Sequence, residues 1–205
     1  MICYDKQFLF IITIPLWILY RVLNYVLKAR KKEEFQLKHE LLINGFFLYS
    51  LAVISVTFFP LFIGNDGSMQ QSAGINYIPV VNTLADLKRI QSSDIPNFML
   101  KFWIRNIGGN LVLLLPMGVF LPILRDRFNS LKTMTIAGFL ISLAIETLQM
   151  LSVFIGNRGR VFDIDDLILN TIGVMIGYGC LCLFRKLWLR QRIDRRTEPP
   201  KSSRA

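Results

Sequence analysis

Five long apolar segments, each bounded by charged or polar residues, most strongly constrain how this chain folds. They cover residues 8–27, 41–63, 103–124, 133–155 and 167–184. The hydrocarbon core of a bilayer is about 30 Å thick, and a helix needs roughly 20 mostly apolar residues to cross it. We therefore predict an all-α fold: a polytopic membrane helix bundle with five transmembrane helices. The fifth segment is the shortest, so its boundaries are the least defined.

Composition and charge support a location in the cell membrane. Apolar residues make up 53% of the 205 residues, and the mean hydropathy is +0.44. The formal net charge is +10, which in a soluble protein would suggest a nucleic acid ligand. Here the Lys and Arg residues gather in the connections and the tail, where they report orientation in the membrane. We expect contact with membrane lipid and no nucleic acid partner.

The distribution of these charges predicts the orientation. Segment 28–40 carries five Lys and Arg residues, segment 125–132 carries three and segment 185–205 carries eight, and these are alternate connections. Cytoplasmic loops carry an excess of Lys and Arg. We therefore predict that the N-terminus lies outside and the C-terminus in the cytoplasm. Because residues 191–205 are polar and contain prolines, we predict that the tail, residues 185–205, is basic and disordered.

Three parts follow from this division. Residues 1–73 are predicted to form an N-terminal transmembrane hairpin with a basic cytoplasmic loop, and residues 74–184 a core with the last three spans. Residues 185–205 form the tail. The three cysteines have no CxxC or CxxH spacing, so neither a disulfide framework nor a zinc site is predicted, and no cofactor is expected.

Glu146 is the strongest functional candidate among the polar residues inside these spans. An ionised side chain in the middle of a bilayer costs at least about 2.5–3.5 kcal/mol. Ser142, Glu146 and Gln149 are spaced by four and then three residues, which places them on one helical face. Two interpretations stay open: a direct functional role, or a buried hydrogen-bond network that holds helices together.

The fifth span carries a second polar face. Three aspartates stand at its start. The residues that share one face are Asp166, Asn170, Gly173 and Gly177. The glycines allow another helix to approach closely, and the polar face of the fourth span is the expected partner. Asp163 and Asp166 fit a helix cap with an acidic residue three positions on. A cation site at these aspartates is the weaker alternative, because no His or Cys accompanies them.

The third span combines amides with a proline. Asn106 and Asn110 share one face, and Pro116 removes a helical hydrogen bond, so a kink or opening is predicted near Leu114. In the first span, Arg21 and Asn24 are expected to extend towards the nearer membrane surface.

Two arginines precede the aspartates of the fifth span. Arg158 and Arg160 lie just outside the membrane in the segment GNRGRVFDIDD. Each either pairs with an aspartate or binds a phosphate or carboxylate of a ligand, because a guanidinium suits both.

The order of these motifs resembles the VanZ-like family of bacterial membrane proteins. INYIPV, NIGGNLVLLLPMGVFLP, ISLAIETLQ and GRVFDIDDLILNTIGVMIGYG follow one another as in that family, over about residues 74–179. Tyr77 stands where the family often has leucine. The resemblance implies importance for Asn110, Pro116, Gly118, Ser142, Glu146, Gln149, Arg160, Asp166, Asn170, Gly173 and Gly177. It also implies a place in the bacterial plasma membrane.

The family's named member is associated with resistance to teicoplanin, a lipidated glycopeptide. The resemblance therefore implies a protein that lowers susceptibility to such antibiotics at the outer leaflet, where antibiotic and lipid-linked cell-wall precursor meet. The alternative is an intramembrane enzyme on a lipid or lipid-linked precursor, with Glu146 as general base. Transport with Glu146 as a proton relay is weaker, because no repeat is evident. A structural role for the whole polar set also stays open, and the sequence does not give the oligomeric state.

Overall fold

The described part of the chain is an all-α helix bundle. The computed structural model describes residues 2–32, 34–64, 74–76, 96–155 and 161–197. In these residues, five helical segments are long and apolar enough to cross a membrane: Lys6–Arg30, Leu37–Phe58, Ile104–Leu124, Leu131–Ile155 and Ile164–Arg190. The predicted five-span helical architecture is thereby confirmed, while the orientation of the termini stays a prediction.

The first two spans form a hairpin. Helix α1 (Lys6–Arg30) packs against helix α2 (Leu37–Phe58). The second span was predicted to reach Ile63, but α2 ends at Phe58 because Phe59, the residue before Pro60, is extended. Beyond it, strand β2 (Leu61–Ile63) pairs antiparallel with strand β1 (Ile2–Tyr4). This pairing joins the ends of the hairpin.

The third span is broken where the sequence predicts. Helix α4 (Pro96–Leu113) ends one residue before Leu114, and helix α5 (Leu115–Leu124) begins after it. The Tyr49 hydroxyl of α2 donates a hydrogen bond of 2.8 Å to the Leu113 carbonyl oxygen. In a membrane, irregular backbone is tolerated where protein shields it and satisfies its polar groups. Tyr49 does so here, and Leu114 itself is fully buried.

The last two spans are longer than predicted. Helix α6 (Leu131–Ser152) begins at a Ser130 cap, whose hydroxyl oxygen accepts from the Thr133 N–H, and it ends in a 3₁₀ turn, Val153–Ile155. Strand β4 (Val161–Asp163) pairs parallel with strand β3 (Gly74–Asn76) and leads into helix α7 (Ile164–Thr197).

The prediction of disorder from residue 185 is wrong as far as Thr197, because α7 continues to that residue. The extension, residues 185–197, contains five Arg, two Leu and one Lys and neither Gly nor Pro, a composition that favours helix. Residues 198–205 lie outside the described residues.

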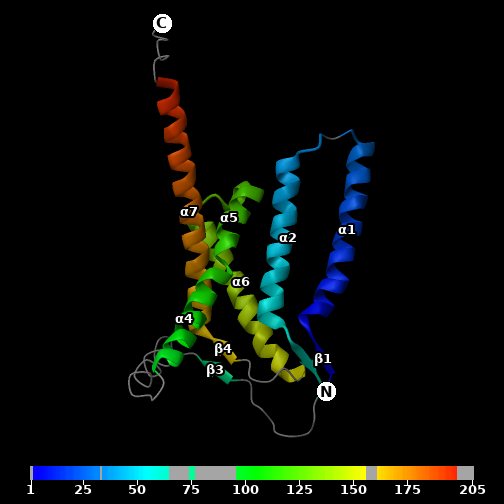
Figure 1. Cartoon of the computed structure of the whole chain (residues 1–205), viewed down its shortest axis with the longest axis vertical. Coiled ribbons are helices and arrows are strands. Elements are labelled where there is room, and N and C mark those ends of the chain that lie inside the picture. The colour runs from blue at the N-terminus through cyan, green and yellow to red at the C-terminus, as the bar shows by residue number, and fades with distance from the viewer. Residues whose placement is uncertain (1, 33, 65–73, 77–95, 156–160, 198–205) are drawn as a thin grey trace.

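The connections sort to the two ends of the bundle. Figure 1 shows the α1–α2 connection and the C-terminal end of α7 at one end, and the N-terminus with both strand pairs at the other. We call these the basic end and the strand end. The α5–α6 connection lies at the basic end too, because its Asn129 side-chain oxygen accepts a hydrogen bond from Arg185 of α7, so the described parts of the three basic segments share one end.

Glycines bring α7 into close contact with the broken third span. A Cβ atom on Gly173 would lie 2.1 Å from the Leu111 carbonyl oxygen, and one on Gly177 would lie 2.0 Å from that of Leu115. The contact is equally close from the side of α5, because a Cβ atom on Gly118 would lie 2.2 Å from the Val174 carbonyl oxygen of α7. The glycines of α7 were expected to face the fourth span, and this is wrong, because they face the third span. Among the described residues of that face, Asn170 is the one that bonds to the fourth span, through Ser142.

Gly177→Ala is expected to destabilise the bundle by about 1–3 kcal/mol, because its methyl group meets backbone that cannot move aside. Gly179→Ala is the matched control on the same helix, since nothing lies within 4 Å of its Cβ position. Thermal unfolding of the full chain in detergent, followed by size-exclusion chromatography, measures both. Equal unfolding temperatures for the two variants would contradict the packing described.

Candidate functional site

A polar cavity opens at the strand end of the bundle. Its volume is about 440 Å³, and helices α2, α4, α6 and α7 all contribute to its wall. The described residues that line it are Val56, Thr57, Arg105, Asn106, Gly109, Asn110, Leu113, Gln149 and Asp166. Four residues that sequence spacing placed on polar faces, from three different helices, therefore meet at one cavity: Asn106, Asn110, Gln149 and Asp166.

Two hydrogen bonds hold the wall together. The Asn110 amide nitrogen of α4 donates to the Asp166 carboxylate of α7. The Gln149 amide nitrogen of α6 donates to the Thr57 carbonyl oxygen of α2 at 3.0 Å. Each bond joins helices that are far apart in the sequence, so the polar side chains fix the shape of the cavity as well as its chemistry.

The cavity presents both signs of charge beside apolar surface. Arg105 and Asp166 supply a positive and a negative charge to the cavity wall, and the Asn106 amide adds an uncharged polar group. Val56 and Leu113 supply apolar surface. Arg105 is exposed, and its fork of N–H donors matches carboxylates and phosphates. Such a lining is suited to a ligand with a charged or hydrogen-bonding head and an apolar remainder.

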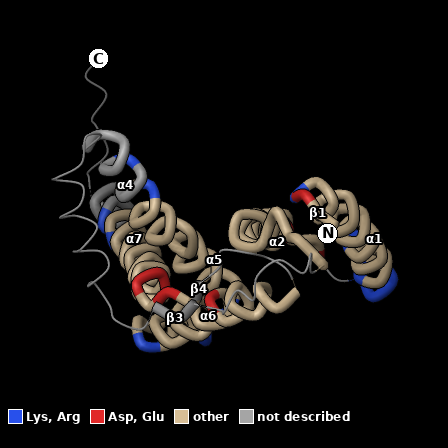
Figure 2. Tube along the Cα trace, turned by 90° about the horizontal axis from the view of Figure 1, so that it is seen from below, with Lys and Arg blue, Asp and Glu red and all other residues tan. Residues whose placement is uncertain are grey.

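Glu146 lies behind this wall. It is only 2% exposed, and its carboxylate accepts a hydrogen bond of 3.2 Å from the Asp163 backbone N–H. The Asp163 carboxylate in turn accepts from the Asp165 N–H at 2.9 Å, which confirms the predicted cap at the start of α7. Figure 2 shows these acidic positions of α6 and α7 close together beside β4. Glu146 thus anchors the turn that carries Asp166 to the cavity.

A second buried pair lies deeper between α6 and α7. The Asn170 amide nitrogen donates to the Ser142 hydroxyl oxygen at 3.1 Å, and both residues are at most 1% exposed. The Asn170 side-chain oxygen has no hydrogen-bond partner among the described residues. This pair is the link between the two polar helix faces that the sequence predicts.

Some predicted features are not placed. Arg158 and Arg160 lie outside the described residues, as does Tyr77. Among the described residues, no three His, Cys, Asp or Glu side chains converge as a group that would hold a metal ion.

Sequence reasoning missed Arg105 and Thr57 as cavity residues. Arg105 was given no role from the sequence, although it precedes Asn106 and stands four residues before Gly109 on the helix that carries Asn110. That spacing was the available signal. Thr57 contributes through its carbonyl oxygen, for which a side-chain pattern gives no signal.

The comparison with protein families gives one result. The sequence model of the VanZ/LLP1 family matches residues 46–185, more than half of the chain. The chain belongs to the VanZ/LLP1 family. Neither the curated proteins nor the solved structures yielded a match.

The VanZ/LLP1 match confirms the resemblance drawn from the motifs and extends it towards the N-terminus. It begins at residue 46 within α2 and ends at residue 185 within α7. All described residues that line the polar cavity fall inside this range. Helix α1 and the first turns of α2 fall outside it.

The Ser142–Asn170 pair is testable by a double-mutant cycle. Ser142→Ala leaves the Asn170 amide without its partner and is expected to cost about 1–3 kcal/mol. Asn170→Leu removes the buried amide at similar volume, so the double variant should be less destabilised than the two singles together, with a coupling of at least about 0.5 kcal/mol. Unfolding in detergent measures this coupling. Strictly additive effects would show that the pair contributes nothing.

Proposed function

We propose that this VanZ/LLP1 protein binds the polar part of an amphiphile in the cavity at the strand end, and thereby lowers susceptibility to lipidated glycopeptides of the teicoplanin type. The ligand is the antibiotic itself or the lipid-linked cell-wall precursor on which it acts. The observation that carries the proposal is the mixed lining, in which Arg105, Asp166 and side-chain amides share one cavity with the apolar Val56 and Leu113.

The size and position of the cavity support an amphiphile. Small-molecule sites have volumes of about 300–1,000 Å³, and 440 Å³ lies within that range. A cavity of this size takes a head group or a sugar with its phosphate, while an acyl chain stays in the bilayer. The strand end is the outer end under the positive-inside prediction, and that is where antibiotic and precursor are exposed.

An intramembrane enzyme on a lipid-linked substrate is the second candidate. Glu146 was the expected general base, but it is not among the described residues that line the cavity, whereas Asp166 is. In this reading Arg105 would hold a phosphate or carboxylate and Asp166 would accept a proton. The binding proposal needs no such transfer, and it assigns Glu146 to holding the start of α7.

Growth inhibition in a susceptible Gram-positive host tests the proposal. Wild-type protein is expected to raise the teicoplanin concentration that stops growth, with little change for vancomycin, which lacks the acyl chain. Asp166→Asn removes the cavity's carboxylate charge and should weaken binding roughly tenfold or more, so protection is lost. Asp126→Asn, the same change at an exposed site at the basic end, should leave protection intact. Membrane levels are compared by blot.

Glu146→Gln separates the binding proposal from an enzyme that uses Glu146 as its general base, whereas an enzyme that uses Asp166 is tested by the lipid analysis that follows. The glutamine oxygen still accepts from the Asp163 N–H, so a binding protein keeps its protection, whereas an enzyme with Glu146 as general base loses it. No protection from well-expressed wild type would contradict the resistance proposal. Analysis of membrane lipids with and without the protein then tests the enzymatic candidate directly.

A further inference from the structure

A separate pocket lies in the part of the hairpin that the family match does not cover. It has a volume of about 420 Å³ and lies between the C-terminal half of α1 and the first turns of α2. The residues that line it are Arg21, Val22, Asn24, Tyr25, Lys28, Ala29, Phe35, Glu40 and Asn44. It lies at the basic end, opposite the polar cavity of the core, and the proposed function assigns nothing to it.

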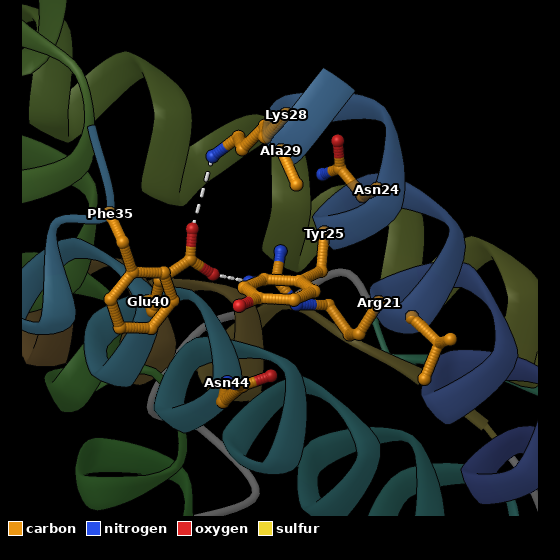
Figure 3. Close-up of a pocket in the computed structure, with 9 residues that line it drawn as sticks. Arg21, Asn24, Tyr25, Lys28, Ala29, Phe35, Glu40 and Asn44 are labelled. Atoms are coloured by element: carbon orange, nitrogen blue, oxygen red, sulfur yellow. Dashed lines mark hydrogen bonds and ion pairs between the residues drawn. The ribbon is translucent and has the colours of Figure 1, made fainter. Parts of the chain in front are cut away.

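The centre of the pocket is one carboxylate held by two cations. Glu40 is 8% exposed and forms ion pairs with Arg21 and with Lys28, the latter at 3.0 Å. Figure 3 shows the Glu40 carboxylate directed between these two side chains. Arg21 was expected to extend towards the nearer membrane surface, and the structure adds a feature that was not predicted: Arg21 is paired across the hairpin with Glu40.

The remaining hydrogen-bonding capacity of this group favours an anion. Glu40 is nearly enclosed by its two partners, whereas the Arg21 and Lys28 side chains keep 18% and 34% of their surface exposed. A guanidinium has five N–H donors and an ammonium three, so donors are left after both pair with Glu40. The three side chains carry a net charge of +1, and the Asn24 amide adds two more donors.

Charged residues at the end of α1, beside the pocket, add to this preference for an anion. Arg30, Lys31 and Lys32 are exposed at the end of α1, and Glu34 is the one exposed acid beside them among the described residues. Among the described residues, the surface beside the pocket therefore carries a net positive charge. Clusters of this kind just outside a transmembrane helix attract anionic lipid, by about 1 kcal/mol for each Lys or Arg.

The surface of the hairpin below the pocket is suited to acyl chains. Arg21 lies nine residues, about two and a half turns, before the end of α1, so the pocket descends from the membrane surface into the hydrocarbon. Below it Trp17 stacks on Phe47, with ring centroids 4.1 Å apart, and Trp17 donates to the Asn44 side-chain oxygen at 2.9 Å. The polar lining thus gives way to aromatic surface, the order in which a phospholipid presents phosphate and chains.

We propose that the α1–α2 pocket binds an anionic phospholipid, with the headgroup phosphate on the free donors of Arg21 and Lys28 and the acyl chains beside Trp17. The site serves to fix the hairpin in the leaflet at the basic end. It is independent of the proposed function of the core cavity, which lies at the other end.

Trp17 provides the readout. The full chain with Trp103→Phe and Trp188→Phe, reconstituted in symmetric vesicles, keeps Trp17 as its single tryptophan. Brominated phosphatidylglycerol is expected to quench its fluorescence with an apparent affinity about fivefold higher than that of brominated phosphatidylcholine. Symmetric vesicles make the result independent of orientation.

Two single changes of charge should act in opposite directions. Lys28→Gln leaves the Arg21–Glu40 pair in place and should bring the preference for phosphatidylglycerol close to one. Glu40→Gln releases both cations and should raise the preference several-fold. Lys132→Gln and Asp126→Asn, the matched changes at exposed sites at the same end, should leave it unchanged.

Several results would overturn the proposal. Equal quenching by the two lipids in the wild type would remove the headgroup site. A preference that falls in Glu40→Gln would show that the three charges are only a structural link, and an equal fall in Lys132→Gln would reduce the effect to surface charge. Loss of the preference on adding millimolar inorganic phosphate would identify a free anion as the ligand in place of lipid.

Discussion

The close approach of α7 to the broken third span is the constraint on which the rest of the bundle depends. Gly173 and Gly177 place α7 against the carbonyl oxygens of Leu111 and Leu115, at a distance that a single methyl group would prevent. Between helices in lipid, association relies on such van der Waals packing and on interhelical hydrogen bonds. With α7 held there, its first turn is fixed beside α4, and Asp166 meets the Asn110 amide.

The polar residues form two groups, one buried and bonded within the protein and one lining the polar cavity. Glu146, Ser142 and Asn170 are buried and bond within the protein, to the start of α7 or to each other. The polar cavity itself is lined by Asp166, Asn110, Gln149 and Arg105. A rigid inner layer that holds an accessible outer layer is what precise binding requires, and the family match covers both layers.

Local features of this fold were predictable from sequence, whereas the pairing of distant segments was not. Pro116 predicts the break at Leu114, and Asp163 predicts the cap of α7, because both effects act within one turn. Spacing also placed Asn170 on a polar face of the fifth span and Ser142 on one of the fourth, which the structure joins by a hydrogen bond. It did not show that the glycines face the third span, or that Arg21 pairs with Glu40, because helical periodicity says which residues share a face and not which helix that face meets.

The central claim is a water-accessible polar cavity at the outer end of the bundle, and cysteine labelling in intact cells tests it most directly. In a chain without its three native cysteines, Val56→Cys lines the cavity, while Ile54→Cys lies one turn or less away on α2 without lining it. A membrane-impermeant, charged thiol reagent needs a hydrated thiolate at the outer face. The account predicts rapid labelling at position 56 and little at position 54. Equal labelling at both, or labelling at 56 only after the cells are permeabilised, would contradict it.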